Sequence, residues 1–119
     1  MSFRFLNFKI YQDSKVFYKE VRGMIKELPT EERFALGDQL RRSSLSIMLN
    51  IAEGSDKGSD KDFGRFLKTA LGSLNETVAG VDVAYSNKYI SKDKYEHLLG
   101  LADALSKQLA SFGRRLASS

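Results

Sequence analysis

The fold is decided by residues 39–54, QLRRSSLSIMLNIAEG. Leu40, Ile47 and Ile51 recur in this stretch at the spacing of one face of an α-helix. A polar stripe runs beside that face and consists of Gln39, Arg42, Ser46, Asn50 and Glu53. A surface helix usually places its charged residues opposite its apolar face. Because this stretch places them beside it, we predict a helix that pairs closely with another helix.

The same apolar spacing recurs along the rest of the 119-residue chain. It predicts helices over about 9–27, about 31–53, about 62–86, and from about 92 onward. The last three of these helices have suitable N-cap residues before them, namely Thr30, Ser59 and Ser91. Gly54 suits a left-handed C-terminal cap on the second helix, and a flexible loop is predicted at 54–61. We therefore predict an all-α protein with one domain over residues 1–119: an antiparallel, up-down-up-down four-helix bundle with flexible ends at about 1–8 and 117–119.

Composition argues against several functional classes. The chain has no cysteine, which excludes disulfides and thiolate metal sites and is typical of a reducing cytoplasm. No apolar run approaches the ~20 residues that span a membrane. His97 is the only histidine, so a catalytic triad would depend entirely on it, and no paired Glu-x-x-His motif supplies a di-iron site. We expect a cytoplasmic protein that is not an enzyme and has no catalytic, cofactor-binding or metal residues.

A matching polar stripe on the third helix predicts how it faces the second. It consists of Arg65, Thr69, Gly72, Ser73, Glu76 and Gly80. Facing positions of antiparallel helices have residue numbers with a nearly constant sum, and both Glu53–Arg65 and Arg42–Glu76 add up to 118. We predict these two ion pairs, with close backbone approach at Gly72. Ordinary surface charge is the alternative explanation.

The second helix also carries a further apolar face, roughly opposite its polar stripe. It consists of Phe34, Leu45, Met48 and Ala52, with Arg41 beside it. Exposed apolar patches of appreciable size usually mark interfaces. These residues therefore predict a homo-oligomer, unless the first or fourth helix covers both faces.

The basic residues are the remaining functional candidates, in a chain of net charge +4. The candidate nucleic-acid-binding residues are Lys15, Lys19, Arg22 and Lys26, which share one face of the first helix, and Arg114 and Arg115 at the C-terminus. A row of cations of this kind can neutralise successive phosphates. The alternative is an ordinary solvated face, interleaved with Glu20 and Glu27.

Taken in order, these motifs are similar to those of a known family. They are QLRR at 39–42, Ser46, NIAEG at 50–54, Phe63, RFL at 65–67, Ala70, Gly72-Ser73 and Glu76. The chain resembles the bacterial four-helix-bundle proteins that are encoded in intervening sequences of 23S ribosomal RNA genes. It is also similar to the accessory variability determinant proteins of diversity-generating retroelements. The chain departs from the family pattern at Tyr11-Gln12, where a tryptophan and an alanine are usual, and at Ser43-Ser44.

This resemblance implies a barrel-like homopentamer. In the retroelement branch it also implies nucleic-acid binding and partnership with a reverse transcriptase, whereas most members have no established activity. Two functional hypotheses therefore stand. The first is an oligomeric bundle that binds structured RNA or DNA through its basic surfaces. The second is an oligomeric protein–protein adaptor, such as the accessory subunit of a reverse transcriptase.

Overall fold

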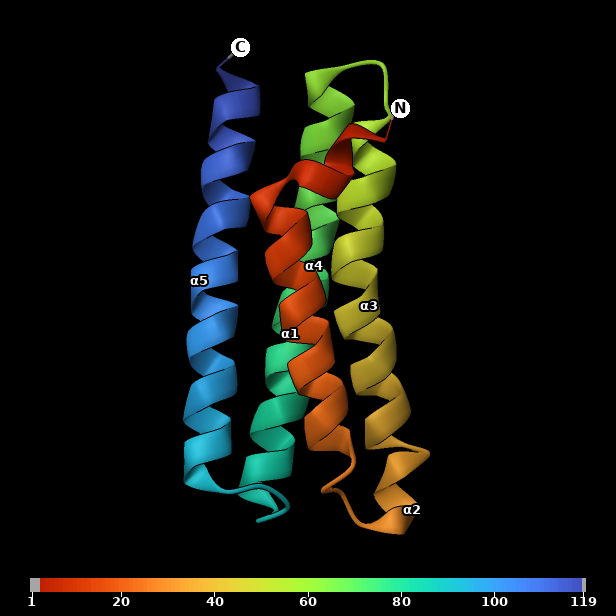
Figure 1. Cartoon of the computed structure of the whole chain (residues 1–119), viewed down its shortest axis with the longest axis vertical. Helices are drawn as coiled ribbons and strands as arrows, with labels where there is room; N and C mark the ends of the chain where they lie inside the picture. Colours follow the sequence, from red (N-terminus) through yellow and green to blue (C-terminus); the bar gives the residue numbers. More distant parts are fainter. Residues whose placement is uncertain (1–2, 119) are drawn as a thin grey trace.

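The protein is a bundle of four long helices in the computed structural model, which describes residues 3–118. Its elements are η1 (Arg4–Asn7), α1 (Lys9–Ile25), α2 (Thr30–Arg33), α3 (Leu36–Ser55), α4 (Asp60–Ser86) and α5 (Lys92–Ala117). The four long helices run alternately down and up a molecule of 45 × 22 × 20 Å (Figure 1). No strand occurs within the described residues. The predicted all-α, up-down-up-down four-helix bundle is confirmed.

The helices form a closed ring around one core. α3 packs against α4, α4 against α5, and α1 against both α3 and α5. The apolar residues that recur at helical spacing in the sequence meet along the axis of this ring, and those that are almost fully buried include Phe17, Val21, Met24, Leu40, Ile47, Ile51, Leu74, Val81, Leu98 and Leu105. Burying a side chain of this kind contributes roughly 1.5–3 kcal/mol. Within residues 3–118, no helix combines the length and the hydropathy that crossing a bilayer requires.

Residues before α1 cover one end of the bundle. Arg4 donates a hydrogen bond from Nη2 to the backbone oxygen of Ser55 at 2.9 Å, and its guanidinium carbon lies 5.7 Å from the ring centre of Phe8. Phe8 in turn stacks on Phe63 of α4, at 6.3 Å between ring centres. Residues 4–7 form a 3₁₀-helix within the lead-in that we predicted to be flexible over 1–8. Met1, Ser2 and Ser119 lie outside the described residues.

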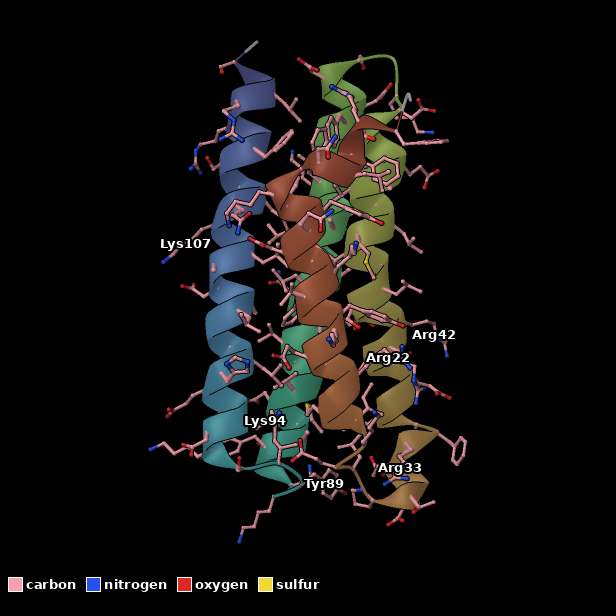
Figure 2. All side chains as sticks on the ribbon, in the orientation of Figure 1. Arg22, Arg33, Arg42, Tyr89, Lys94 and Lys107 are labelled. Atoms are coloured by element: carbon pink, nitrogen blue, oxygen red, sulfur yellow. The ribbon has the colours of Figure 1, made fainter. Side chains whose placement is uncertain are left out.

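The prediction of one continuous helix over 31–53 is wrong. The helix is interrupted between α2 and α3, where Ala35 takes a non-helical conformation (φ −116°, ψ −85°). Arg33 holds α2 against the end of α1, because its Nε donates to the Leu28 oxygen at 3.1 Å and its Nη2 to the Lys26 oxygen at 2.8 Å. The last carbonyls of a helix have no partner within it. The guanidinium therefore caps α1, and it lies against the α1–α2 turn (Figure 2).

Two of the three predicted N-caps are confirmed. The Ser59 hydroxyl accepts from the Asp62 backbone N–H at the start of α4, and the Ser91 hydroxyl accepts from the Lys94 backbone N–H at the start of α5. The third is wrong, because Thr30 is itself the first residue of α2, which has no side-chain cap. The linker between α3 and α4 comprises residues 56–59 and is therefore shorter than the loop predicted at 54–61.

The closest approaches of α3 and α4 involve Gly54 and Gly80, not Gly72. A Cβ atom on Gly54 would lie 2.6 Å from Cβ of Phe66, and one on Gly80 would lie 2.6 Å from Cδ2 of Leu40. Gly72 has open space at the same position. The predicted approach at Gly72 is therefore wrong. So is the left-handed cap at Gly54, because no described glycine has a positive φ angle and Gly54 lies within α3.

These contacts define the register of the α3–α4 pair. The hydroxyls of Ser43 and Thr77 lie 2.7 Å apart across the interface, and their residue numbers add up to 120. The close pairs Gly54–Phe66 and Leu40–Gly80 have the same sum. The observed register differs from the predicted sum of 118 by two residues, which corresponds to about 3 Å along the helix axes. This displacement changes which side chains face one another.

Candidate nucleic-acid interface

The predicted basic residues of α1 form one continuous outer surface. Lys15, Lys19, Arg22 and Lys26 are all exposed. At a rise of 1.5 Å per residue, they extend over about 16 Å of the helix. Within residues 3–118, none of the four forms an ion pair. We call these four residues the α1 basic face.

Two tyrosines support the cations of this face. Lys15 Nζ lies 5.7 Å from the ring centre of Tyr11, and the guanidinium carbon of Arg22 lies 5.8 Å from the ring centre of Tyr18. A cation over an exposed aromatic ring gains about 0.5–1 kcal/mol. The contact restrains each side chain without neutralising its charge. Tyr11 and Tyr18 were not predicted, although each precedes its cation by four residues, which is the spacing of neighbours on a helix surface.

The carboxylates of α1 face away from its basic face, toward α5. Asp13, Glu20 and Glu27 recur at seven-residue intervals and therefore share one side of the helix. Their partners on α5 are Gln108 for Asp13 (2.8 Å), His97 for Glu20 (3.2 Å) and Lys94 for Glu27 (3.9 Å). The sequence suggested that Glu20 and Glu27 are interleaved with the cations. The structure instead separates the two charges onto different sides of α1.

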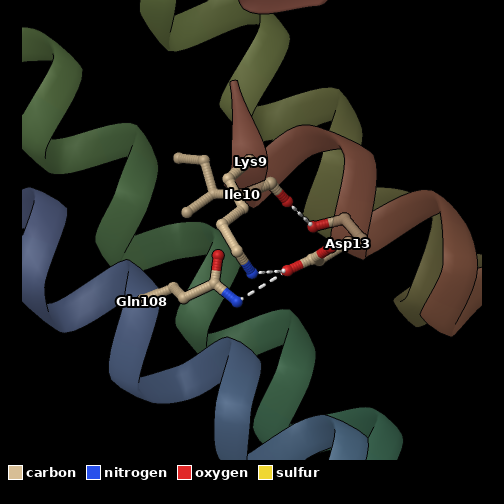
Figure 3. A network of polar contacts seen from close by, with 5 residues as sticks. Lys9, Ile10, Asp13 and Gln108 are labelled. Atoms are coloured by element: carbon tan, nitrogen blue, oxygen red, sulfur yellow. Dashed lines mark hydrogen bonds and ion pairs between the residues drawn. The ribbon is translucent and has the colours of Figure 1, made fainter. Parts of the chain in front are cut away.

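The contact between Asp13 and Gln108 is the most elaborate of the three (Figure 3). The Asp13 carboxylate accepts from Lys9 Nζ at 2.6 Å and from Gln108 Nε2 at 2.8 Å, and these two hydrogen bonds lower the pKa of Asp13. A carboxylate only accepts hydrogen bonds, so the Gln108 amide must present its nitrogen to Asp13. As a result, its buried Oε1 has no hydrogen-bond partner among the described residues.

The two C-terminal arginines lie at the end of the bundle farthest from Lys26. The Arg115 guanidinium lies 5.2 Å from the ring centre of Phe112 and donates to the Ser111 hydroxyl at 3.1 Å. Arg114 lines a groove between α4 and α5. The structure therefore does not bring Arg114 and Arg115 together with the α1 basic face, and their contact with nucleic acid stays a prediction.

The ion pairs predicted between α3 and α4 are wrong. The observed partners are Lys57 for Glu53 (3.9 Å), Asp62 for Arg65, and Gln39 for Glu76 (3.2 Å). Arg42 is exposed and points away from α4 (Figure 2). The physical reason for the missing Arg42–Glu76 pair is the direction of Arg42, which points to solvent from the outer side of α3, so that Gln39 contacts Glu76 in its place. Glu53 and Arg65 pair instead with charged residues four and three positions away along the chain.

Smaller residues of the polar stripes do meet across this interface. The Ser46 and Ser73 hydroxyls lie 2.9 Å apart. Asn50 Nδ2 also donates to the Ser46 hydroxyl at 3.0 Å and to its backbone oxygen at 2.8 Å. The two polar stripes are therefore joined by hydrogen bonds among hydroxyl and amide groups, and not by the predicted ion pairs.

The predicted interface residues of α3 differ in exposure. Phe34 is 79% exposed, whereas Met48 is buried at 7%. Leu45, Ala52 and Arg41 are half-buried, and Arg41 pairs with Asp38 on its own helix. Met48 is thus not available on this surface, because α1 packs against α3. The remaining face includes Leu49, which is 54% exposed and was not predicted.

The fold and these motifs can now be compared with known proteins. Residues 6–111 match the model of the 23S rRNA-intervening sequence protein family. The chain belongs to this family. The NIAEG motif lies on α3, and the RFL and Gly72-Ser73 motifs lie on α4.

A solved structure supports the 23S rRNA-intervening sequence assignment. The bundle is similar to the crystal structure of a protein of unknown function from the S23 ribosomal protein family of Bacteroides thetaiotaomicron, with a TM-score of 0.79. The two sequences are 28% identical, and the match covers 86% of this chain and 95% of the other. Among curated proteins, none matches the chain in sequence.

Proposed function

We propose that this protein is a homo-oligomeric bundle that binds structured RNA or DNA through the α1 basic face. The observation that carries the proposal is the separation of charge on α1. Lys15, Lys19, Arg22 and Lys26 are exposed without ion pairs among residues 3–118, while the carboxylates of the same helix contact α5. An ordinary solvated face would mix the two signs.

The expected mechanism is neutralisation of phosphates with release of counterions. Each phosphate contact to duplex DNA contributes about −0.9 to the slope of log K against log salt concentration, so four contacts give roughly −3.6 per protomer. Phosphate contacts alone carry no base specificity. Several copies of the face in one oligomer raise the effective concentration of the second and later contacts.

We also propose that the protein is not an enzyme and acts in the cytoplasm. Support comes from the cysteine-free composition and from the environment of the single histidine. His97 Nε2 lies 3.2 Å from Glu20 on an exposed part of the surface. Residues 3–118 contain no cluster of three or more histidine, aspartate or glutamate side chains arranged to hold a metal.

The test is a salt titration of binding to duplex DNA and to structured ribosomal RNA. One variant reverses the charge of all four residues of the α1 basic face. A matched control reverses four exposed lysines elsewhere: Lys57, Lys88, Lys92 and Lys107. Both variants have the same net charge. We expect the first to lose most binding and most of the salt slope, and the control to keep both.

Equal losses in the two variants would show that net charge, not the α1 basic face, drives binding. Absence of binding at low salt would overturn the nucleic-acid proposal. The protein–protein adaptor, including an accessory role for a reverse transcriptase, would then be the hypothesis to pursue.

A further inference from the structure

A groove lies between the first half of α4 and the last turns of α5. Its volume is about 910 Å³, and its floor is apolar, with Leu71, Leu109 and Leu116. Lys61, Lys68 and Arg114 line its edges. None of these three cations forms an ion pair within residues 3–118. Asp60 and Arg65 also line the groove, so it combines an apolar floor with a rim on which basic residues outnumber acidic ones.

Two glycines keep the groove open. Gly64 on α4 and Gly113 on α5 both line it, and a Cβ atom on either would meet no other atom within 4 Å. Glycine in a helix interior costs about 1 kcal/mol relative to alanine. Neither glycine is explained by packing within the protomer. Both widen the space above the leucine floor.

A second feature without a role in the protomer lies on α2. Phe34, which follows the last residue of α2, is 79% exposed, the largest value among the large apolar side chains described. Glu31 and Glu32 precede it, and neither forms an ion pair within the described residues. Arg33 is directed toward the α1 carbonyls. Glu31 precedes Phe34 by three residues, which is the spacing of neighbours on a helix surface, so α2 presents an aromatic ring beside the Glu31 carboxylate.

We propose that Phe34 of one protomer inserts into the α4–α5 groove of a second copy, with Glu31 facing its basic rim. The two features match in polarity, because the ring suits the apolar floor and the Glu31 carboxylate suits Lys61, Lys68 and Arg114. Aromatic side chains are enriched in the cores of protein interfaces. The inference rests on the homo-oligomer of the proposed function, for which it supplies the contact.

The positions of the two features decide the type of contact. α2 lies at one end of the bundle, and the start of α4 and the end of α5 lie at the other (Figure 1). The bundle is 45 Å long, so one protomer cannot fill its own groove with its own Phe34. The contact joins unlike surfaces of successive copies. A heterologous contact of this kind closes into a ring when the rotation between copies allows it.

The test uses complementary variants whose mass in solution is measured by light scattering, without nucleic acid. Phe34→Asp removes the ring from an exposed site but leaves the groove intact. Gly113→Leu fills the groove but leaves Phe34 intact, and Lys68→Glu serves as a second groove variant on an exposed residue. Val16→Asp is the matched control, because it removes an exposed apolar side chain that lies outside both the groove and the predicted α3 interface. Circular dichroism checks that each variant is helical.

We expect the wild type and Val16→Asp to form the same oligomer. Phe34→Asp and Gly113→Leu should each be monomeric, with the dissociation constant raised at least about thirtyfold, as for loss of an interface hot spot. Mixing those two variants should yield a one-to-one dimer and nothing larger, because only one ring and one open groove remain to pair.

A mixture that stays monomeric, or a single variant that keeps the wild-type mass, would overturn the inference while the homo-oligomer itself stands. A monomeric wild type would overturn both the contact and the homo-oligomer. The salt titration of the α1 basic face is independent of these results, so failure of nucleic-acid binding can be told apart from failure of this contact.

Discussion

The Ser43 and Thr77 hydroxyls form a 2.7 Å hydrogen bond across the α3–α4 interface, where both side chains are buried. Thr77 also lies 2.8 Å from the Ser73 backbone oxygen, whereas Ser43 is 3.4 Å from that of Leu40. Each hydroxyl has one proton to donate. The shorter distance indicates that the Thr77 hydroxyl donates its proton to the Ser73 backbone oxygen. The hydrogen bond between the two side chains is therefore donated by Ser43 and accepted by Thr77.

This hydrogen bond predicts coupling between the two residues. Ser43→Ala should lower the free energy of unfolding by about 1–2 kcal/mol, and Thr77→Val should cost more, because it also removes the bond to the Ser73 oxygen. The double variant should cost less than the sum of the single variants, since both single variants lose the same Ser43–Thr77 bond. Urea denaturation of all four proteins measures the coupling. Strictly additive losses would contradict a hydrogen bond between the two hydroxyls.

Three glycines of α3 and α4 should respond differently to alanine. Gly54→Ala should destabilise by about 1–3 kcal/mol, because the new methyl group meets Cβ of Phe66, which is fixed to the helix backbone. Gly80→Ala should cost less, since it meets the end of the Leu40 side chain. Gly72→Ala should be neutral or stabilising by up to about 1 kcal/mol, because its site is open. Thermal denaturation of the three variants tests this ranking. The reverse order would show that the helices approach elsewhere.

The lowered pKa of Asp13 predicts an acid dependence of stability. A carboxyl whose pKa is lowered in the folded state makes its full contribution to stability when the pH is above its ordinary pKa, which is 3.8 for Asp13. This contribution is lost as the pH falls through the lowered pKa of the folded state. The contribution is below about 1 kcal/mol, because the Asp13–Lys9 pair is largely exposed. Asp13→Asn should therefore reduce the loss of stability between neutral pH and pH values below about 4. Identical pH profiles for the wild type and the variant would rule out this role.

Tyr95 should titrate above its ordinary pKa. Its hydroxyl donates to Asp82 Oδ1 at 2.8 Å, and this hydrogen bond is the main cause that raises the pKa of the phenol. Loss of its proton would place a second negative charge beside the carboxylate. Asp82→Asn should lower the pKa of Tyr95 toward its ordinary value, which ultraviolet titration can measure, with Tyr95→Phe identifying the signal. An unchanged titration in Asp82→Asn would mean that the carboxylate does not control the phenol.

Much of the fold could be predicted from the sequence because helix formation and apolar burial are local and periodic. The apolar spacing is sufficient to identify the four long helices, and the serine caps at Ser59 and Ser91 have short-range causes. The four cations of the α1 basic face also follow from periodicity alone. Residues four or three apart on one helix share a face whatever packs against the other side.

Only the tertiary structure decided which side chains meet between helices. The α3–α4 register depends on where Gly54 and Gly80 allow the backbones to approach, and Glu76 meets Gln39 across this interface in place of the predicted Arg42. The partners of the α1 carboxylates were likewise decided by α5, whose His97 and Lys94 lie far away in the sequence but contact Glu20 and Glu27. Periodicity determines the faces of a helix, whereas packing determines which partner each face receives.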